Sequence, residues 1–277
     1  MQENYSKLLT YAYNIVGSFD DARDLVHDVF EKYLSIDKAK IINESNFLIK
    51  SVINHSINFK SRQNKLGVFG EWLPEPVSFE NAETKLIREQ TAGYTMLVLL
   101  ENLNPKERAV FILKEGFSYS HSEIADLLDI SPDNSRQLLS RANKQLQNID
   151  FLPDNLSSQT NTGILQKYQV ALSEANIQEI EDLLVNDIKL TADGGRKVLV
   201  VKATEVGKTA TATLLAYIQQ QFLAGKKYSF HTFNHQPAVC FWNDDKIYNC
   251  HILQTDLQGK IHQIYSIVDS RKLKNLI

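Results

Sequence analysis

The first 66 residues alternate apolar and polar positions at the spacing of amphipathic helices. One helix is expected over residues 20–34, where Ser18 and Asp21 have the spacing of a capping box. A second helix is expected over residues 45–62. Each helix carries a polar stripe opposite its apolar face. The stripes are Asp21, Asp24, Asp28 and Glu31 on the first helix, and Lys50, Asn54, Asn58 and Arg62 on the second. The acidic stripe of the first helix is ordinarily a solvated face, and the alternative is a docking surface for a basic partner.

Glycine and proline interrupt this pattern within residues 67–80, which marks a domain boundary. Helical periodicity then returns, and Pro105 is suited to the first position of a helix. Ser120 begins a second capping box, and a tight turn at residues 129–132 leads into a third helix over residues 133–147. This succession predicts a helix-turn-helix.

The third helix of that unit is basic, although the whole chain has a net charge of −3. In a helix-turn-helix the N-terminal part of the last helix enters the major groove, where Arg and Gln can pair with base edges. A plain three-helix bundle is the alternative. The candidate DNA contacts are Asn134, Ser135, Arg136, Gln137, Ser140 and Arg141.

The pattern changes after a polar linker at residues 151–162. Two short helical segments are followed by segments rich in aromatic and β-branched residues. These expected strands are 226–234, 238–243, 246–255 and 260–268, separated by turn residues at 235–237, 243–245 and 257–259. The last third is therefore expected to be α+β, with a curved antiparallel meander.

Composition narrows the class of protein. The chain has 277 residues, enough for two or three domains, and its 43% hydrophobic and 23% charged residues are typical of globular proteins. We expect a cytoplasmic protein, because no apolar stretch approaches a membrane span and the start has no signal-peptide pattern. Two cysteines are too few for a disulfide framework. The slight negative charge argues against tight autonomous binding to nucleic acid, so DNA contacts should be local and helped by a partner.

Both helical regions resemble domains 2 and 4 of extracytoplasmic-function sigma factors, which belong to the sigma-70 family. The resemblance rests on residues 18–30, 54–62 and 103–142. It implies two partners, promoter DNA and the RNA polymerase core, the latter through the clamp helices of the largest subunit and the flap. It places Asp24, Leu25, Asp28 and Phe30 at the clamp helices. It places Asn54, Asn58 and Arg62 at the minus-ten element and residues 134–141 at the minus-thirty-five element, although the minus-ten helix has fewer arginines than is usual.

The segment Glu71-Trp-Leu-Pro-Glu-Pro76 is similar to a linker signature of the sigma subgroup with a SnoaL-like C-terminal extension. Its two prolines favour an extended chain, and Trp72 offers a large apolar anchor. The resemblance implies that residues 191–197 form a glycine loop and that residues 269–273 loosely match a C-terminal motif. We expect the linker and the loop to make a regulatory contact. Its expected residues are Trp72, Leu73, Pro74, Glu75, Pro76, Asp193, Gly194, Gly195 and Arg196.

Other chemistry finds little support in the sequence. Gly207-Lys-Thr209 ends like a phosphate-binding loop, but the earlier glycine of that motif is absent. His231 and His235 would be about 13 Å apart on a strand, too far for one zinc ion. His251 and His262 are expected to be strand-face histidines. We therefore expect no catalytic pair, no metal site and no cofactor.

Five segments are expected: sigma domain 2 (1–66), a linker (67–90), sigma domain 4 (91–150), a second linker (151–162) and a SnoaL-like regulatory domain (163–277). The predicted fold is multidomain, with two all-α sigma domains, a helical bundle and a helix-turn-helix, followed by an α+β cone. The expected function is that of a monomeric promoter-specificity subunit, with the third domain regulating the first two in cis. One alternative is an enzyme or small-ligand-binding protein that uses the cone, and another is a polymerase-independent repressor, which the net charge disfavours.

Overall fold

The structure is a computed structural model that describes residues 2–38, 41–65, 72–78, 90–147, 158–195, 205–256, 258–274 and 276. The chain forms two compact units, one containing residues 1–67 and 79–151 and the other residues 68–78 and 152–277. The middle of the first linker thus belongs to the C-terminal unit. The five segment boundaries stay a prediction.

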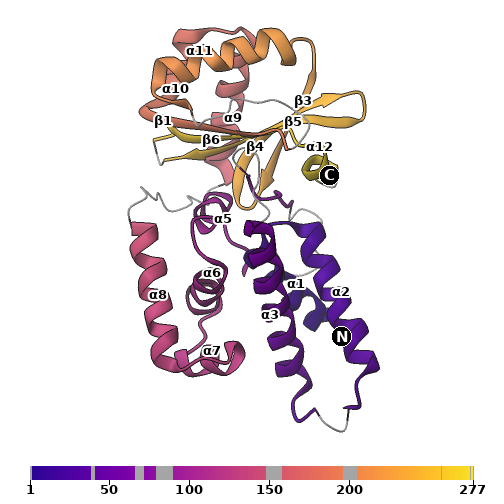
Figure 1. The fold of residues 1–277 in the computed structure, drawn as a ribbon. Coiled ribbons are helices and arrows are strands. Elements are labelled where there is room, and N and C mark those ends of the chain that lie inside the picture. Colours follow the sequence, from indigo (N-terminus) through magenta and orange to yellow (C-terminus); the bar gives the residue numbers. More distant parts are fainter. Residues whose placement is uncertain are drawn as a thin grey trace. The chain divides into compact units, whose positions relative to one another are not determined.

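Three helices form the first module of the first unit, and each packs on the other two. They are α1 (Gln2–Val16), α2 (Phe19–Ser35) and α3 (Glu44–Lys65), shown in Figure 1. The hydroxyl of Ser18 accepts a hydrogen bond from the main-chain N–H of Asp21, so the predicted start of α2 is confirmed. The apolar faces of α2 and α3 are buried where the periodicity placed them.

The second module contains the predicted helix-turn-helix. Its elements are α5 (Tyr94–Leu100), α6 (Pro105–Phe111), a π-helical turn η2 (Ile112–Gly116), α7 (His121–Leu128) and α8 (Pro132–Gln147). Capping boxes at Asn104 and Ser120 start α6 and α7. Asp129 adopts a left-handed conformation, with φ of 52°, and ends α7 before the turn into α8.

The second unit is α+β, as predicted. Its helices are α9 (Ser158–Ser173), α10 (Ile177–Leu183), α11 (Lys208–Ile218), the π-helical turn η3 (Gln219–Leu223) and α12 (Ser270–Leu273). Its strands are β1 (Leu184–Asp193), β2 (Glu205–Val206), β3 (Lys227–Phe233), β4 (Gln236–Asn243), β5 (Lys246–Thr255) and β6 (Ile261–Ile267).

The sheet is mixed and open, which corrects the expectation of an antiparallel one. Its order is β2-β1-β6-β5-β4-β3, and β3 to β6 form the predicted antiparallel meander. β1 was not predicted, and it pairs in parallel with β6. The first turn also differs slightly, because Asn234 and His235 adopt positive φ while Gln236 already belongs to β4.

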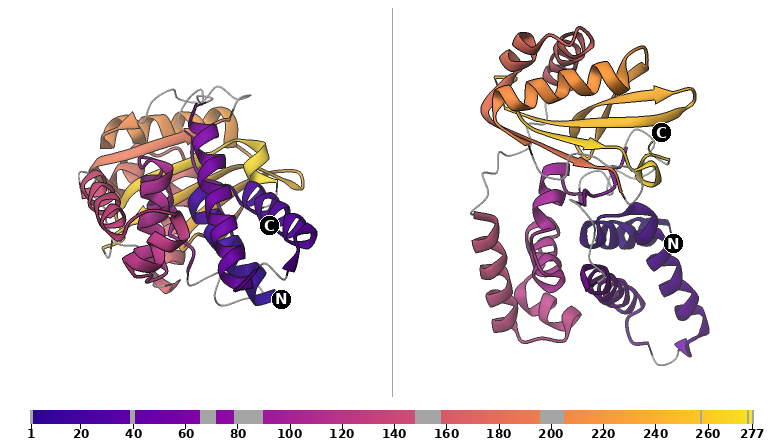
Figure 2. Two further views of the ribbon diagram at one scale, coloured as in Figure 1. Left: turned by 60° about the horizontal axis from the view of Figure 1, so that its bottom comes forward. Right: turned by 45° about the horizontal axis from the view of Figure 1, so that its top comes forward.

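The two faces of the sheet are covered differently. Helices α9, α10 and α11 pack on one face, through a core that includes Tyr168, Leu215, Val239, Phe241 and Leu253. Figures 1 and 2 show α10 and α11 on one side of the sheet and the short α12 on the other. The second face is therefore available to the C-terminal tail and the linker.

Candidate functional site

The acidic stripe of α2 is only partly a surface. Asp24 and Asp28 are exposed, and Phe30 is half-buried with its ring stacked on that of Tyr5. Leu25 is 9% exposed and belongs to the core of the module, so its expected contact with the clamp helices stays a prediction that its burial does not favour. The face offered to a basic partner includes the exposed carboxylates of Asp24, Asp28 and Glu31 beside the half-buried Phe30.

Part of the polar stripe of α3 contacts the helix-turn-helix. Lys50 donates from Nζ to the carboxylate of Asp129 at 2.5 Å and to the main-chain oxygen of Asp126 at 3.1 Å. Asn54 donates from Nδ2 to the main-chain oxygen of Leu127 at 3.2 Å. These acceptors lie at the C-terminal end of α7, where main-chain carbonyls lack helical partners and favour cations.

The other half of the stripe is open to solvent. Asn58 and Arg62 are exposed on α3. The structure therefore divides the residues that the resemblance places at the minus-ten element. Asn54 is engaged by the second module, whereas Asn58 and Arg62 are available. No pattern in the sequence indicated this division, because it depends on how two separate modules meet.

A buried ionic cluster, formed by Lys60, Glu101 and Arg108, joins the same two modules. Lys60 Nζ lies 2.7 Å from Glu101 Oε2 and donates to the main-chain oxygen of Val16. Arg108, which is fully buried, pairs with Glu101 and donates from Nε to the main-chain oxygen of Asn14 at 2.8 Å. Both cations thus have a carboxylate and a carbonyl as partners, as buried charges require. No pattern in the sequence indicated this cluster.

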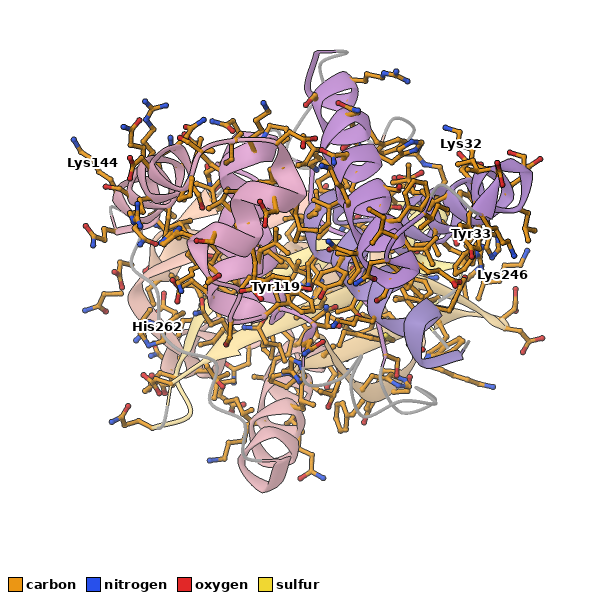
Figure 3. The ribbon with its side chains drawn as sticks, turned by 90° about the horizontal axis from the view of Figure 1, so that it is seen from below. Lys32, Tyr33, Tyr119, Lys144, Lys246 and His262 are labelled. Atoms are coloured by element: carbon orange, nitrogen blue, oxygen red, sulfur yellow. The ribbon has the colours of Figure 1, made fainter. Side chains whose placement is uncertain are left out.

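Two tyrosines complete the seam between the modules. The hydroxyls of Tyr11 on α1 and Tyr119 before α7 are hydrogen-bonded at 2.7 Å. Figure 3 shows Tyr119 between the helices of the first and second modules. The contact buries Tyr11, whose pKa is raised by burial and by the Tyr119 hydroxyl.

Helix α8 presents most of its predicted contacts to solvent. Arg136 is exposed and pairs with Asp133 one turn earlier. Ser135 is fully buried, and its hydroxyl is hydrogen-bonded to Nδ1 of His121 at 2.9 Å, so its expected role as a DNA contact stays a prediction that this packing does not favour. Lys144 points outward from α8 in Figure 3. The exposed candidates are Asn134, Arg136, Gln137, Ser140 and Arg141.

The linker and the glycine loop meet in the second unit at a hub formed by Trp72, Leu73, Asp193 and Lys272. The main-chain N–H of Leu73 donates to Oδ2 of Asp193 at 2.9 Å, and Lys272 Nζ lies 2.5 Å from the same oxygen. Lys272 also donates to the main-chain oxygen of Leu73, and its Nζ lies 4.3 Å from the centroid of the Trp72 ring. The second carboxylate oxygen of Asp193 accepts from the N–H of Gly195 at 2.8 Å.

The linker continues along the sheet after the hub. Val77 donates its N–H to the side-chain oxygen of Asn234 at 2.8 Å, and Asn234 returns its own N–H to the oxygen of Val77. Ser78 forms an isolated antiparallel bridge with Phe233. The main-chain bond from Asn234 to Val77 and the bridge at Ser78 extend the edge of the sheet at β3 by a short stretch of linker.

Gly195 and Lys272 are further residues that shape the hub. Gly195 has a φ of 62°, and a Cβ at this position would clash with the carboxylate of Asp269, so glycine is required twice over. Arg196 lies outside the described residues. Lys272 belongs to the tail segment that matches the subgroup motif only loosely, and the structure makes it the cation of the hub.

A buried histidine lies on the face of the sheet that the helices cover. His251 is a strand-face residue, as predicted, and its Nδ1 is hydrogen-bonded to the hydroxyl of Tyr168 at 2.9 Å. Burial lowers the pKa of His251 to about 4, which keeps the imidazole neutral. Among the described residues, no cluster of His, Cys, Asp and Glu could hold a metal ion. Within the same residues, no helix is long and apolar enough to cross a membrane.

Comparisons with known proteins agree with this arrangement. Residues 95–146 match the family model described as sigma-70, region 4. The chain is 24% identical over 221 residues to the ECF RNA polymerase sigma factor SigJ of Mycobacterium tuberculosis, covering 77% of this chain and 70% of that protein. It is 23% identical over 208 residues to the probable ECF RNA polymerase sigma factor SigI of the same species, covering 73% and 71%.

The crystal structure of Mycobacterium tuberculosis SigJ superposes with a TM-score of 0.77 at 22% identity, covering 99% of this chain and 97% of that one. The likeness shows that the two chains share a fold, including the α+β unit after the helical modules. The chain is thus similar in sequence to extracytoplasmic-function sigma factors and shares the fold of SigJ.

Proposed function

We propose that this protein directs core RNA polymerase to specific promoters and that its fused C-terminal unit regulates it in cis. The observation that carries the proposal is the position of the region 4 match. Residues 95–146 cover the helix-turn-helix, whose last helix exposes Arg136 and Gln137 in its N-terminal part and Arg141 past its middle. A second helical module with a polar stripe precedes it, as sigma factors require.

Polymerase binding is assigned to the exposed part of the acidic stripe. Asp24 and Asp28 lie one turn apart on α2 and face solvent. A cationic surface on the polymerase clamp would pair with them, and Phe30 would add an apolar contact. Catalysis belongs to the polymerase, so this chain acts as a binding protein, and its site of action is the cytoplasm.

Promoter binding is assigned to both modules. Asn58 and Arg62 are free to meet the minus-ten element, and the start of α8 meets the minus-thirty-five element. Asn54 reaches DNA only after the contact between α3 and α7 opens. The observed closed form of the helical unit is therefore the resting state, and promoter engagement selects an open one.

Cis regulation acts through the linker. The described part of the linker, residues 72–78, belongs to the chain segment between the two sigma modules, yet it is bonded to the C-terminal unit. Anchoring the middle of a tether restricts how far its two ends can separate. The C-terminal unit thereby biases the equilibrium between the closed and open forms of the sigma modules.

The test is transcription in vitro with purified core polymerase on a pool of genomic promoter fragments, read by sequencing the transcript starts. The whole chain should produce defined start sites that core polymerase alone does not. The charge-reversed variant D24K/D28K should lose transcription and co-purification with the core at physiological salt. The matched control is D187K, which reverses an exposed charge on β1 and should keep both. Co-purification of the double variant at the wild-type level contradicts the assignment.

A further inference from the structure

Two cysteines face each other in the sheet of the second unit. Cys240 on β4 is the register partner of Cys250 on β5, both side chains are fully buried and both thiols are free. Their Sγ atoms are 3.6 Å apart. Opposed residues on antiparallel strands have Cα atoms about 4.5–5.5 Å apart, which is within the range that a disulfide spans. A bond between the two sulfur atoms therefore needs only side-chain rotation.

The pair belongs to one row of residues across the sheet. Opposed residues on neighbouring strands point to the same face. Val239 and Phe241, on either side of Cys240, belong to the helix-covered core, so Cys240 points to the other face. Successive register partners across β3, β4, β5, β6 and β1 are Ser229, Cys240, Cys250, Ile267 and Asp193.

This row links the thiols to the hub. Asp193, at the end of the row, carries the ion pair with Lys272 and the hydrogen bond from Leu73. Helix α12, which contains Lys272, packs against β5, which contains Cys250. The linker and the tail thus dock on the face that holds the two thiols.

Burial protects the thiols from reaction. A thiolate is the reactive form of cysteine, and an apolar environment suppresses it. Burial raises the pKa of the Cys250 thiol, and the neighbouring Cys240 thiol raises it further. Oxidation therefore requires the linker and tail to leave this face, at least transiently, so that water and oxidant can enter.

We propose that Cys240 and Cys250 are a peroxide-sensitive dithiol that closes to a cross-strand disulfide when the hub opens. The site belongs to the sheet, and its oxidation is measured on the protein itself, so it does not depend on the proposed sigma-factor function. The ligand class is hydrogen peroxide or a small organic peroxide, which fits a site made of two thiols and no metal ligands.

The reaction balances in two steps. One cysteine, as the thiolate, attacks a peroxide oxygen, the O–O bond breaks, and a sulfenic acid forms while the released hydroxide takes up the thiol proton as water. The sulfur of the second cysteine then attacks the sulfenic sulfur, the S–S bond forms and the S–O bond breaks, releasing a second water. The two thiols lose two electrons and two protons, and hydrogen peroxide is reduced to two waters.

The experiment follows oxidation of the full-length reduced protein by hydrogen peroxide. Samples are quenched with an alkylating reagent, and mass spectrometry of the peptides counts free thiols and intramolecular disulfide. The variant K272M removes the cation of the hub, and the variant W72A removes its aromatic contact. The matched control is K167M, on the exposed side of α9. Circular dichroism checks that each variant is folded. If one of the two hub variants does not fold, the other is used for the comparison.

In the wild type and in K167M, the Cys240–Cys250 disulfide should form slowly. In a folded hub variant it should form faster by about tenfold or more, because removing one partner of a buried pair weakens docking. C240S and C250S should each abolish the linked peptide. Equal rates in the hub variant and in K167M contradict the gating. Thiols that stay alkylatable in a folded hub variant, or that yield only sulfinic acid or disulfides between molecules, overturn the proposal. In that case Cys240 and Cys250 serve only as small, buried, apolar side chains in the core.

Discussion

Two clusters of charge hold together distant parts of this chain, and they differ in their access to water. At the outer edge of the seam between the helical modules, Lys50 and Asp129 have side chains that are 38% and 75% exposed. In the hub of the C-terminal unit, Lys272 and Asp193 are 9% and 4% exposed. Exposed ion pairs contribute little and are screened by salt, whereas breaking a buried pair is costly. The seam can therefore part at its edge while the linker stays anchored.

Within the seam, the side chains that make contacts are exposed at the edge and more buried at the inner end. In the ionic cluster of Lys60, Glu101 and Arg108, the lysine and arginine side chains are 4% and 0% exposed and the glutamate side chain is 20% exposed, so its two cations are as buried as the hub. Asn54, by contrast, lies beside the exposed Lys50–Asp129 pair. Opening can thus begin where the polar stripe of α3 is covered and leave the inner cluster intact. The exposed contacts at the edge of the seam are thus the weak ones, and the buried contacts of the inner cluster and the hub are the strong ones.

The substitution with the largest expected effect is E101Q. It leaves Lys60 and Arg108 buried without their carboxylate, which should cost about 3–5 kcal/mol of the free energy of unfolding. Urea denaturation followed by circular dichroism measures it. A matched control is E31Q, which neutralises an exposed carboxylate on α2 and should change little. A loss below about 1 kcal/mol, the contribution of an exposed ion pair, would mean that the inner end of the seam is as weak as its edge.

The second expected effect is that of D193N in the hub. One buried cation, Lys272, loses its ion-pair partner, so we expect a loss of about 3 kcal/mol in the stability of the C-terminal unit. Limited proteolysis near residues 72–78 should also accelerate, because the linker loses its anchor. The control is D187N, an exposed aspartate on the same strand. Unchanged proteolysis of D193N with an intact fold would show that the linker is held by its other contacts alone.

An intermediate effect is expected on the exposed surface of α8. R136A removes a side chain that makes only a local ion pair with Asp133, so folding should be unaffected. If Arg136 pairs with a guanine, promoter discrimination should fall by about 1–3 kcal/mol at one base pair. Binding or transcription on a panel of single-base promoter variants measures this. An equal loss on every variant makes Arg136 a phosphate contact instead.

The smallest expected effect is that of D129N at the edge of the seam. The exposed pair with Lys50 should contribute less than about 1 kcal/mol, so the unfolding midpoint should hardly move. Opening of the seam should nevertheless become easier, and promoter binding should increase modestly at low salt. The difference from the wild type should shrink as ionic strength rises, because salt screens the original pair. A large loss of stability in D129N would mean that the edge contributes as much to stability as the inner cluster does.

Local chemistry explains which parts of the fold were predictable. Ser18 and Ser120 start helices through hydrogen bonds to residues three positions away, and such short-range signals are present in the sequence itself. The four meander strands follow from their composition and turn residues. β1 escaped prediction because its alternation is irregular, with exposed Asn186 and Asp187 in succession and a register shift before Lys189.

The sequence alone determined the order of the elements, the helix-turn-helix, the polar stripes and, through the family resemblance, the approach of the linker to the glycine loop. Only the tertiary structure decided which of those polar residues are free. Asn54 is covered by α7, Ser135 faces His121, and Lys272 completes a hub with Asp193. Helical and strand periodicities report which face of an element is apolar, because they depend on neighbours along the chain. The partner of a polar side chain depends on segments far away in sequence, and no local pattern contains that information.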